Sequence, residues 1–172
     1  GLDTDHPWHR LERGEISLAD YSIALSSLIA AAGLTPASDP PATGSTSQAA
    51  FTFEPNVAMI DLVHDLHSQR VLPRIKLGVL TNNVREFKDG WRAMMDFDRL
   101  FDDVVDSHEL GIRKPNAEIY RVALERLGAE PGRTAFLDDS PANVAAATAL
   151  GMHGIVVDVD PTAAIARVRD LT

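Results

Sequence analysis

The sequence predicts an α/β fold, in which helices cover both faces of a parallel β-sheet. From about residue 54 onward, short apolar stretches of strand length alternate with stretches of helical periodicity. This order is typical of parallel strands joined by crossover helices. Hydrophobic residues make up 45% of the 172 residues, which is enough to build the core of one domain with a small insertion.

Four apolar stretches are predicted to form strands, the second of them short. They lie at residues 75–80, 104–105, 134–138 and 154–158. Each is separated from the next by a helical pattern or by a polar loop, so we expect the strands to run parallel.

Capping residues mark the ends of the predicted helices. Ser17 is expected to cap a helix that ends at Gly33. Ser140, followed by Pro141, is expected to begin an Ala-rich helix that closes at Gly151. Four further helices are predicted, at residues 55–70, 85–96, 116–127 and 161–169.

The stretch 35–50 divides the chain into two parts. It is rich in Pro, Ser, Thr and Gly and has no periodicity, so we expect a loop or linker there. The sequence therefore predicts a small helical piece with its linker at residues 1–53 and an α/β core at residues 54–172.

Composition excludes several classes of function. The net charge of −9 argues against a nucleic-acid partner, although a local Lys and a metal ion would still allow a small phosphorylated ligand. The absence of cysteine excludes a thiolate nucleophile, a disulfide framework and a cysteine zinc site. No apolar run has the length of a membrane span, and no signal-peptide pattern opens the chain, so we expect a cytoplasmic location and no membrane partner.

Three polar groups follow predicted strands or lie in the loops after them. They are Thr81-Asn82-Asn83, Lys114 and the pair Asp138-Asp139. Taken singly, they have ordinary interpretations as a turn, a surface lysine and a helix cap. Together they predict a phosphate site, because a hydroxyl and backbone amides hold phosphate oxygens and a Lys neutralises their charge. An acidic pair supplies the hard oxygen ligands that Mg²⁺ prefers.

The order and residue types of these groups resemble the motifs of the haloacid dehalogenase-like hydrolases. The family's second, third and fourth motifs are similar to VLTNN (79–83), RKPNAEIY (113–120) and FLDDSPANV (136–144). The segment PWHRLERGEIS (7–17) resembles the small helical cap of the family's phosphatases, which include the amino-terminal phosphatase domain of soluble epoxide hydrolases. The resemblance covers nearly the whole chain.

By position, the resemblance implies a role for each residue on the phosphate side. Thr81, Asn82 and Asn83 are expected to bind the phosphate of a small phosphorylated substrate. Lys114 is expected to orient and neutralise it, so that Thr81 and Lys114 take part in catalysis.

On the metal side, the resemblance implies Mg²⁺ as the cofactor. Asp139 is expected to be a direct Mg²⁺ ligand, with Asp138 as a second ligand or as support for the first. Asn143, one helical turn further on, is expected to buttress the acidic loop.

The family's first motif, an apolar strand followed by D-x-D-G-[TV], has no counterpart in the sequence. In the family, its first Asp attacks phosphorus to form an aspartyl-phosphate, and its second Asp protonates the leaving group. The strand is central in the family's sheet, so the resemblance implies two half-sheets with open inner edges. Such edges favour pairing with another chain, and a homodimer is one form this could take.

We therefore expect the chain to be part of a longer Mg²⁺-dependent phosphohydrolase, and by itself to turn over no substrate and to bind Mg²⁺ weakly. A non-catalytic module that binds a phosphometabolite or a protein is an alternative, because the nucleophile is absent. A haloacid dehalogenase is another, although it works without Mg²⁺ and the acidic pair argues against it. The substrate is not indicated, and Trp8, His9 and Arg10 either line the entrance or pack against the core.

Overall fold

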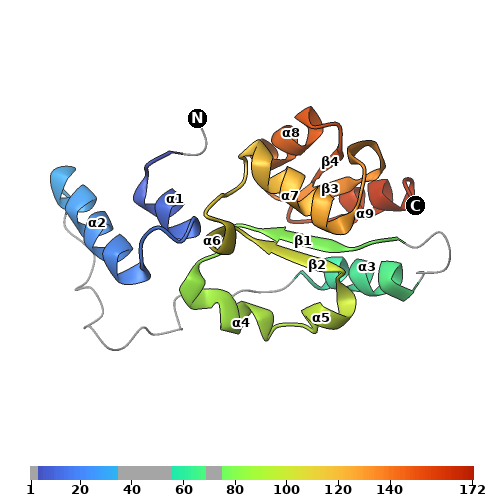
Figure 1. Cartoon of the computed structure of the whole chain (residues 1–172), viewed down its shortest axis with the longest axis horizontal. Helices are drawn as coiled ribbons and strands as arrows, with labels where there is room; N and C mark the ends of the chain where they lie inside the picture. Colours follow the sequence, from blue (N-terminus) through green and yellow to red (C-terminus); the bar gives the residue numbers. More distant parts are fainter. Residues whose placement is uncertain (1–3, 35–55, 69–74) are drawn as a thin grey trace.

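The computed structural model describes residues 4–34, 56–68 and 75–172 (Figure 1). Helices α1 (Pro7–Glu12) and α2 (Leu18–Ala31) stand to one side of an α/β core. The predicted loop at 35–50 and the predicted boundary near residue 53 lie outside the described residues, so the division into two domains stays a prediction.

The core contains short parallel strands separated by helices. Its elements in chain order are α3 (Val57–Ser68), β1 (Gly78–Thr81), the 3-10 turn η2 (Arg85–Phe87), α4 (Lys88–Arg92), α5 (Phe97–Leu100), β2 (Asp103–Asp106), α6 (Ser107–Leu110), α7 (Ala117–Leu127), the 3-10 turn η3 (Pro131–Arg133), β3 (Ala135–Asp138), α8 (Pro141–Ala149), β4 (His153–Val156) and α9 (Thr162–Arg169). None of the helices in these described segments has the length and apolarity that crossing a membrane requires.

The strands form two separate parallel pairs within the described part of the chain. Strand β1 pairs with β2, in a register that sets Thr81 beside Asp106. Strand β3 pairs with β4, in a register that sets Asp138 beside Val156. The predicted α/β class and the predicted two half-sheets are both confirmed.

Two apolar clusters cover opposite faces of the strands. One joins Leu80, Val105 and Phe136 to helices α7 and α8, and it includes the fully buried Tyr120. The other joins neighbouring strand positions, such as Leu137, to α3 and α9. Because successive strand residues point to opposite faces, alternating positions reach the two clusters. Because the strands are buried on both faces, their sequences are continuous apolar runs.

An apolar cavity of about 310 Å³ lies between the two strand pairs. Val79 and Leu80 of β1 line it together with Phe136 and Leu137 of β3. Residues of α3, α7 and α9 complete its walls. The unpaired edges that the sequence predicted therefore border a shared apolar space.

Most of the predicted elements are present, and the differences have local causes. Ser17 caps α2 through a capping box with Asp20, as a cap at this position requires. The single helix predicted at 85–96 is wrong: the chain forms η2 and α4 there, and then begins α5 at Phe97. The Asp96 side chain accepts a hydrogen bond from the Arg99 N–H, which starts a new helix at that point. Helices α1 and α6 were not predicted, because six and four residues are too few to show a period.

Candidate phosphate and metal site

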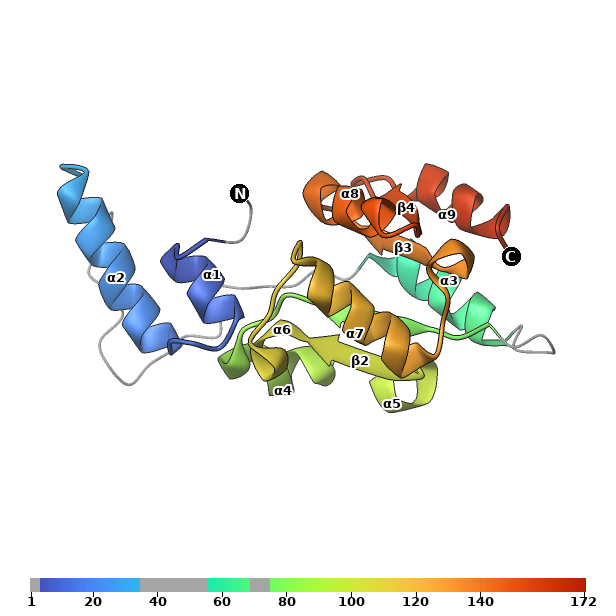
Figure 2. The same cartoon turned by 45° about the horizontal axis from the view of Figure 1, so that its top comes forward.

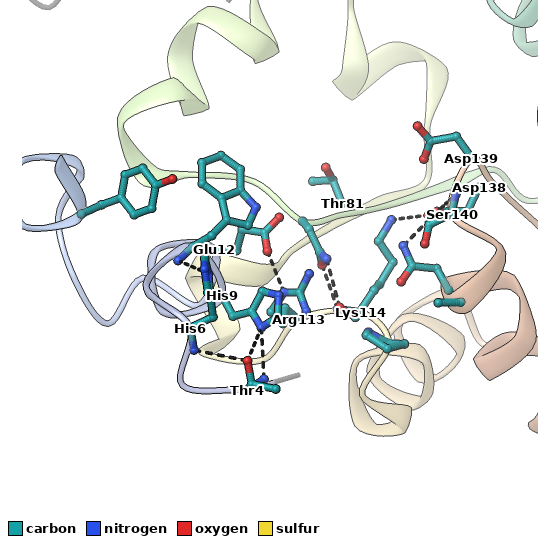
Figure 3. A pocket seen from close by; sticks show the side chains of 16 residues that line it. Thr4, His6, His9, Glu12, Thr81, Arg113, Lys114, Asp138, Asp139 and Ser140 are labelled. Carbon is teal, nitrogen blue, oxygen red and sulfur yellow. Dashed lines mark hydrogen bonds and ion pairs between the residues drawn. The ribbon is translucent and has the colours of Figure 1, made fainter. Parts of the chain in front are cut away.

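All of the predicted polar residues except Asn83 meet at a cavity of about 810 Å³ between the core and the α1–α2 pair. Figure 3 shows Asp138, Asp139 and Ser140 on one side and His6, His9 and Glu12 on the other, with Thr81 and Lys114 between them. The core contributes the carboxyl ends of β1 and β3 and the loop before α7. Ligands bind at this end of the strands in open α/β sheets.

The loop after β1 is fixed to the loop before α7 by a pair of hydrogen bonds. The Lys114 N–H donates to Asn82 Oδ1 at 2.8 Å, and Asn82 Nδ2 donates to the Lys114 carbonyl oxygen at 3.1 Å. An amide side chain that satisfies both backbone groups of one residue holds the two loops in register. Asn82 therefore has a structural task at the site, and Thr81 lies beside it on the pocket wall.

Lys114 connects the two strand pairs at the base of the pocket. Its Nζ donates to Asp138 Oδ2 at 2.6 Å and to the Leu80 carbonyl oxygen at 2.8 Å. The side chains of Lys114 and Asp138 are only 9% and 6% exposed. A buried ammonium held by a carboxylate and a carbonyl is a fixed positive charge in a region of weak screening.

The two acidic residues have different surroundings. Asp138 is fully engaged, because its second oxygen, Oδ1, accepts from the Ser140 N–H and from Asn143 Nδ2, each at 2.9 Å. Asp139 is exposed on the pocket wall, and no hydrogen bond or ion pair joins it to any described residue. Asp139 is thus the more available carboxylate for a metal ion.

The donor set of the described residues fits part of a site for Mg²⁺. Within residues 4–34, 56–68 and 75–172, no three His, Cys, Asp or Glu side chains are grouped as a metal cluster. Mg²⁺ commonly takes one or two carboxylates and fills its remaining positions with water and phosphate oxygens. Asp139, with Asp138 behind it, meets that requirement but leaves room for a further ligand.

Asn143 occupies the position that a supporting residue needs. Besides its bond to Asp138, its carbonyl oxygen accepts the hydroxyl of Tyr120 at 2.9 Å. Burial, and then the nearby charge of Asp138, raises the pKa of Tyr120 far above its usual value. The phenol therefore stays protonated and keeps the start of α8 in place.

Asn83 lies away from the pocket that holds the other predicted residues. Its Nδ2 donates to Asp106 Oδ2 at 3.2 Å, and its backbone N–H donates to Ser107 Oγ at 3.1 Å. Asp106 also accepts from His108 Nδ1 at 2.7 Å. In this arrangement Asn83 holds the β1 loop against the end of β2, and its role in substrate binding stays a prediction.

One part of the site was not predicted from the sequence: the junction between α1 and the core. Arg113 Nε donates to Glu12 Oε2 at 2.7 Å, and both side chains are about nine-tenths buried. Ser107 Oγ donates to the carbonyl oxygen of the same Glu12 at 2.5 Å. Arg113 directly precedes Lys114, so α1 is attached to the loop that carries the buried ammonium. Nothing near Glu12 in the sequence indicates a partner 101 residues away.

The sequence left open whether Trp8, His9 and Arg10 line the pocket entrance or pack against the core. Trp8 and His9 line the pocket, together with Tyr21 from α2. Arg10 does not line it, because its side chain pairs with Glu15 at 3.2 Å and is 45% exposed.

Comparison with known proteins identifies the family. A sequence model described as haloacid dehalogenase-like hydrolase matches residues 58–151, which is just over half of the chain. The chain belongs to the haloacid dehalogenase-like hydrolases. The family resemblance seen in the three motifs is therefore confirmed.

Individual relatives support the same assignment. The chain is 31% identical over 148 residues to the sesquiterpene phosphatase astK of Aspergillus oryzae, covering 86% of this chain and 70% of that protein. It is 39% identical over 90 residues to the mouse acyl-CoA dehydrogenase family member 10, covering 52% of this chain but only 8% of that protein.

Among solved structures, a haloacid dehalogenase family enzyme from Bacteroides thetaiotaomicron superposes with a TM-score of 0.67 over 91% of this chain and 76% of its own. The two are 20% identical, so the likeness shows a shared fold.

Proposed function

We propose that this chain provides the phosphate-binding and metal-binding half of a Mg²⁺-dependent phosphomonoesterase. The observation that carries the proposal is the buried Lys114 ammonium, which joins Asp138 to the end of β1 beside Thr81. A fixed cation, a hydroxyl and an exposed carboxylate around one pocket match a phosphoryl group and its metal ion. The matched phosphatase, and the Bacteroides enzyme solved in complex with magnesium and inorganic phosphate, support this choice.

Each residue has a definite task in this proposal. Thr81 and the amides that follow it donate to phosphate oxygens, and Lys114 neutralises the charge that develops on them. Asn82 keeps Lys114 in place through the hydrogen bonds to its backbone N–H and carbonyl oxygen. Asp139, supported by Asp138, would hold Mg²⁺, which supplies electrostatic stabilisation of the transferring phosphoryl group.

We propose that the nucleophile is an Asp carried on a strand that occupies the cavity between β1 and β3. In that position a parallel strand would pair with both open edges and end at the phosphate pocket. Its carboxylate would attack phosphorus as the bond to the ester oxygen breaks, and the second Asp after the same strand would protonate that oxygen. Water would then hydrolyse the aspartyl-phosphate. In the described pocket, Asp138 is held by Lys114, Ser140 and Asn143, so it is poorly placed to attack.

The proposal is tested by supplying the strand as a synthetic peptide, an apolar run followed by Asp-x-Asp-Gly-Thr. Peptide binding is first measured by fluorescence anisotropy, and release of phosphate from phenyl phosphate is then followed in Mg²⁺. We expect turnover with this peptide, and none with a matched peptide whose first Asp is Asn. A bound Asp peptide without turnover, or equal turnover by the chain alone, would contradict the proposal.

A second candidate is a non-catalytic module that binds a phosphometabolite or another protein. It is favoured by the incomplete set of carboxylates around the described pocket. It predicts phosphate binding through Lys114 but no turnover with any bound strand peptide. A cytoplasmic location and a homodimer formed through the open strand edges remain expectations.

A further inference from the structure

The end of the pocket away from the acidic pair is built from aromatic rings. Trp8 of α1 and Tyr21 of α2 line it, with ring centroids 5.4 Å apart in an edge-to-face arrangement. His6 and His9 lie beside them, with their own ring centroids 5.6 Å apart. Trp8 and Tyr21 are only half-buried, so they offer apolar area to a ligand. Flat rings bind other flat or cyclic apolar groups with little loss of side-chain entropy.

Backbone hydrogen bonds engage the two imidazoles at this end. His6 Nδ1 accepts from the Trp8 N–H at 3.2 Å, and His9 Nδ1 accepts from the Thr4 N–H at 3.1 Å. A ring nitrogen that accepts a backbone N–H is occupied by the protein and is not available to a ligand. Both rings are therefore held in place by the backbone at the start of α1.

The arginine near this end is compensated within the protein. Arg113 lines the pocket, but its Nε donates to the buried carboxylate of Glu12 at 2.7 Å. Lys114 is turned to the other end, where it holds Asp138. A second phosphate or a carboxylate on the leaving group would find no Lys or Arg without a carboxylate partner among the described residues that line the pocket.

From this arrangement we propose that the aromatic end binds the leaving group of the substrate, and that this group is an uncharged aromatic or flat cyclic alcohol. The substrates would be phosphomonoesters of such alcohols, in preference to bisphosphates and to esters of charged or strongly hydrated alcohols. This inference rests on the proposed function for the phosphate end, but the two ends are tested separately.

The test compares phenylphosphonate with methylphosphonate, two ligands with the same anionic head and a carbon–phosphorus bond that resists hydrolysis. Dissociation constants are measured by calorimetry on the full chain in Mg²⁺. We expect phenylphosphonate to bind at least about tenfold more tightly, because its ring is removed from water between the aromatic side chains. Phenol alone is expected to shift the indole N–H resonance of Trp8 and not that of Trp91. Trp91 is outside this pocket, packed on Phe97 with ring centroids 4.3 Å apart.

Two variants separate the aromatic end from the rest of the molecule. Trp8→Leu should reduce the preference for phenylphosphonate to about threefold or less and leave methylphosphonate binding unchanged, because it removes the flat surface only. Trp91→Phe, the matched control, should leave both dissociation constants as they are.

The outcomes distinguish this inference from the proposed function. If methylphosphonate binds and the phenyl group adds nothing, the inference is overturned and the phosphate site stands. The inference is also overturned if Trp8→Leu keeps the full preference. If phenol shifts Trp8 while neither phosphonate binds, the aromatic end is supported and the proposed function fails.

Discussion

The junction between Glu12 and Arg113 allows a quantitative prediction. Glu12→Gln removes the negative charge and keeps the size of the side chain, so the buried Arg113 loses its ion pair with Glu12. Loss of one partner from a buried ion pair costs about 3–5 kcal/mol. Because each side chain is about a tenth exposed and Gln can still accept one hydrogen bond, we expect about 2–3 kcal/mol.

This loss should act on the docking of α1 rather than on the whole fold. The α1–α2 pair stands beside the core, and Glu12 attaches it through both its side chain and its carbonyl oxygen (Figure 2). A penalty of about 2–3 kcal/mol makes the undocked state roughly 30- to 150-fold more populated. Hydrogen exchange of the α1 amides should accelerate by that factor, while exchange in α7 stays unchanged.

A matched control makes the comparison decisive. Glu15→Gln is the same chemical change on the same part of the chain, but Glu15 is 40% exposed and pairs at the surface with Arg10 and Arg13. Surface pairs contribute only about 0–1 kcal/mol, so exchange should change by less than about fivefold. Equal exchange in Glu12→Gln and Glu15→Gln would refute the reasoning. The double variant Glu12→Leu/Arg113→Met should recover most of the protection, because it leaves no buried charge.

Other predictions concern the backbone, alkaline stability and the acidic pair. Gly14 and Gly33 both have positive φ, but a Cβ on Gly14 would lie 2.8 Å from the His108 carbonyl oxygen and one on Gly33 would meet nothing within 4 Å. Gly33→Ala should lower the free energy of unfolding by about 1–2 kcal/mol, and Gly14→Ala should lower stability clearly more. Thermal unfolding or hydrogen exchange of the α1 amides measures the difference. Equal losses would contradict the described docking of α1. The folded-state pKa of Tyr120 is raised, so its contribution to stability is present below the unfolded pKa of about 10 and is lost as pH rises above it. In denaturant titrations above pH about 10, the wild type should lose stability faster than Tyr120→Phe, by up to about 1.4 kcal/mol per pH unit, and parallel slopes would contradict this. Asp139→Asn should weaken Mg²⁺-dependent phosphate binding in calorimetry at least about tenfold and barely change the melting temperature, because Asp139 is exposed; unchanged binding would remove it from the metal site.

The sequence predicted the elements whose signals are local. Asn116 begins α7 by accepting the Glu118 N–H, and Gly128 ends it with a left-handed backbone. Such caps act within four residues, so a single sequence displays them. The pair of carboxylates at the end of β3 could be predicted in the same way. An apolar run precedes the pair and a helix start follows it, and both are visible in the sequence.

Contacts between distant segments could not be predicted in the same way. The partner of Glu12 depends on where a six-residue helix docks, and α1 is too short to show which face it buries. The direction of Asn83 depends on the buried Asp106 at the end of the neighbouring strand. Both belong to tertiary packing, which local propensity does not specify.

The most direct test of the phosphate site is the binding of inorganic phosphate in Mg²⁺, measured by calorimetry for Lys114→Met and Lys88→Met. Lys88 is a matched control, because its ammonium pairs with Glu109 at 2.6 Å on the surface, with its side chain 40% exposed. If Lys114 is the fixed cation of a phosphate site, Lys114→Met should weaken phosphate binding at least about tenfold, and Lys88→Met should leave it unchanged. Phosphate binding that is equal in both variants and in the wild type would contradict the assignment of this pocket.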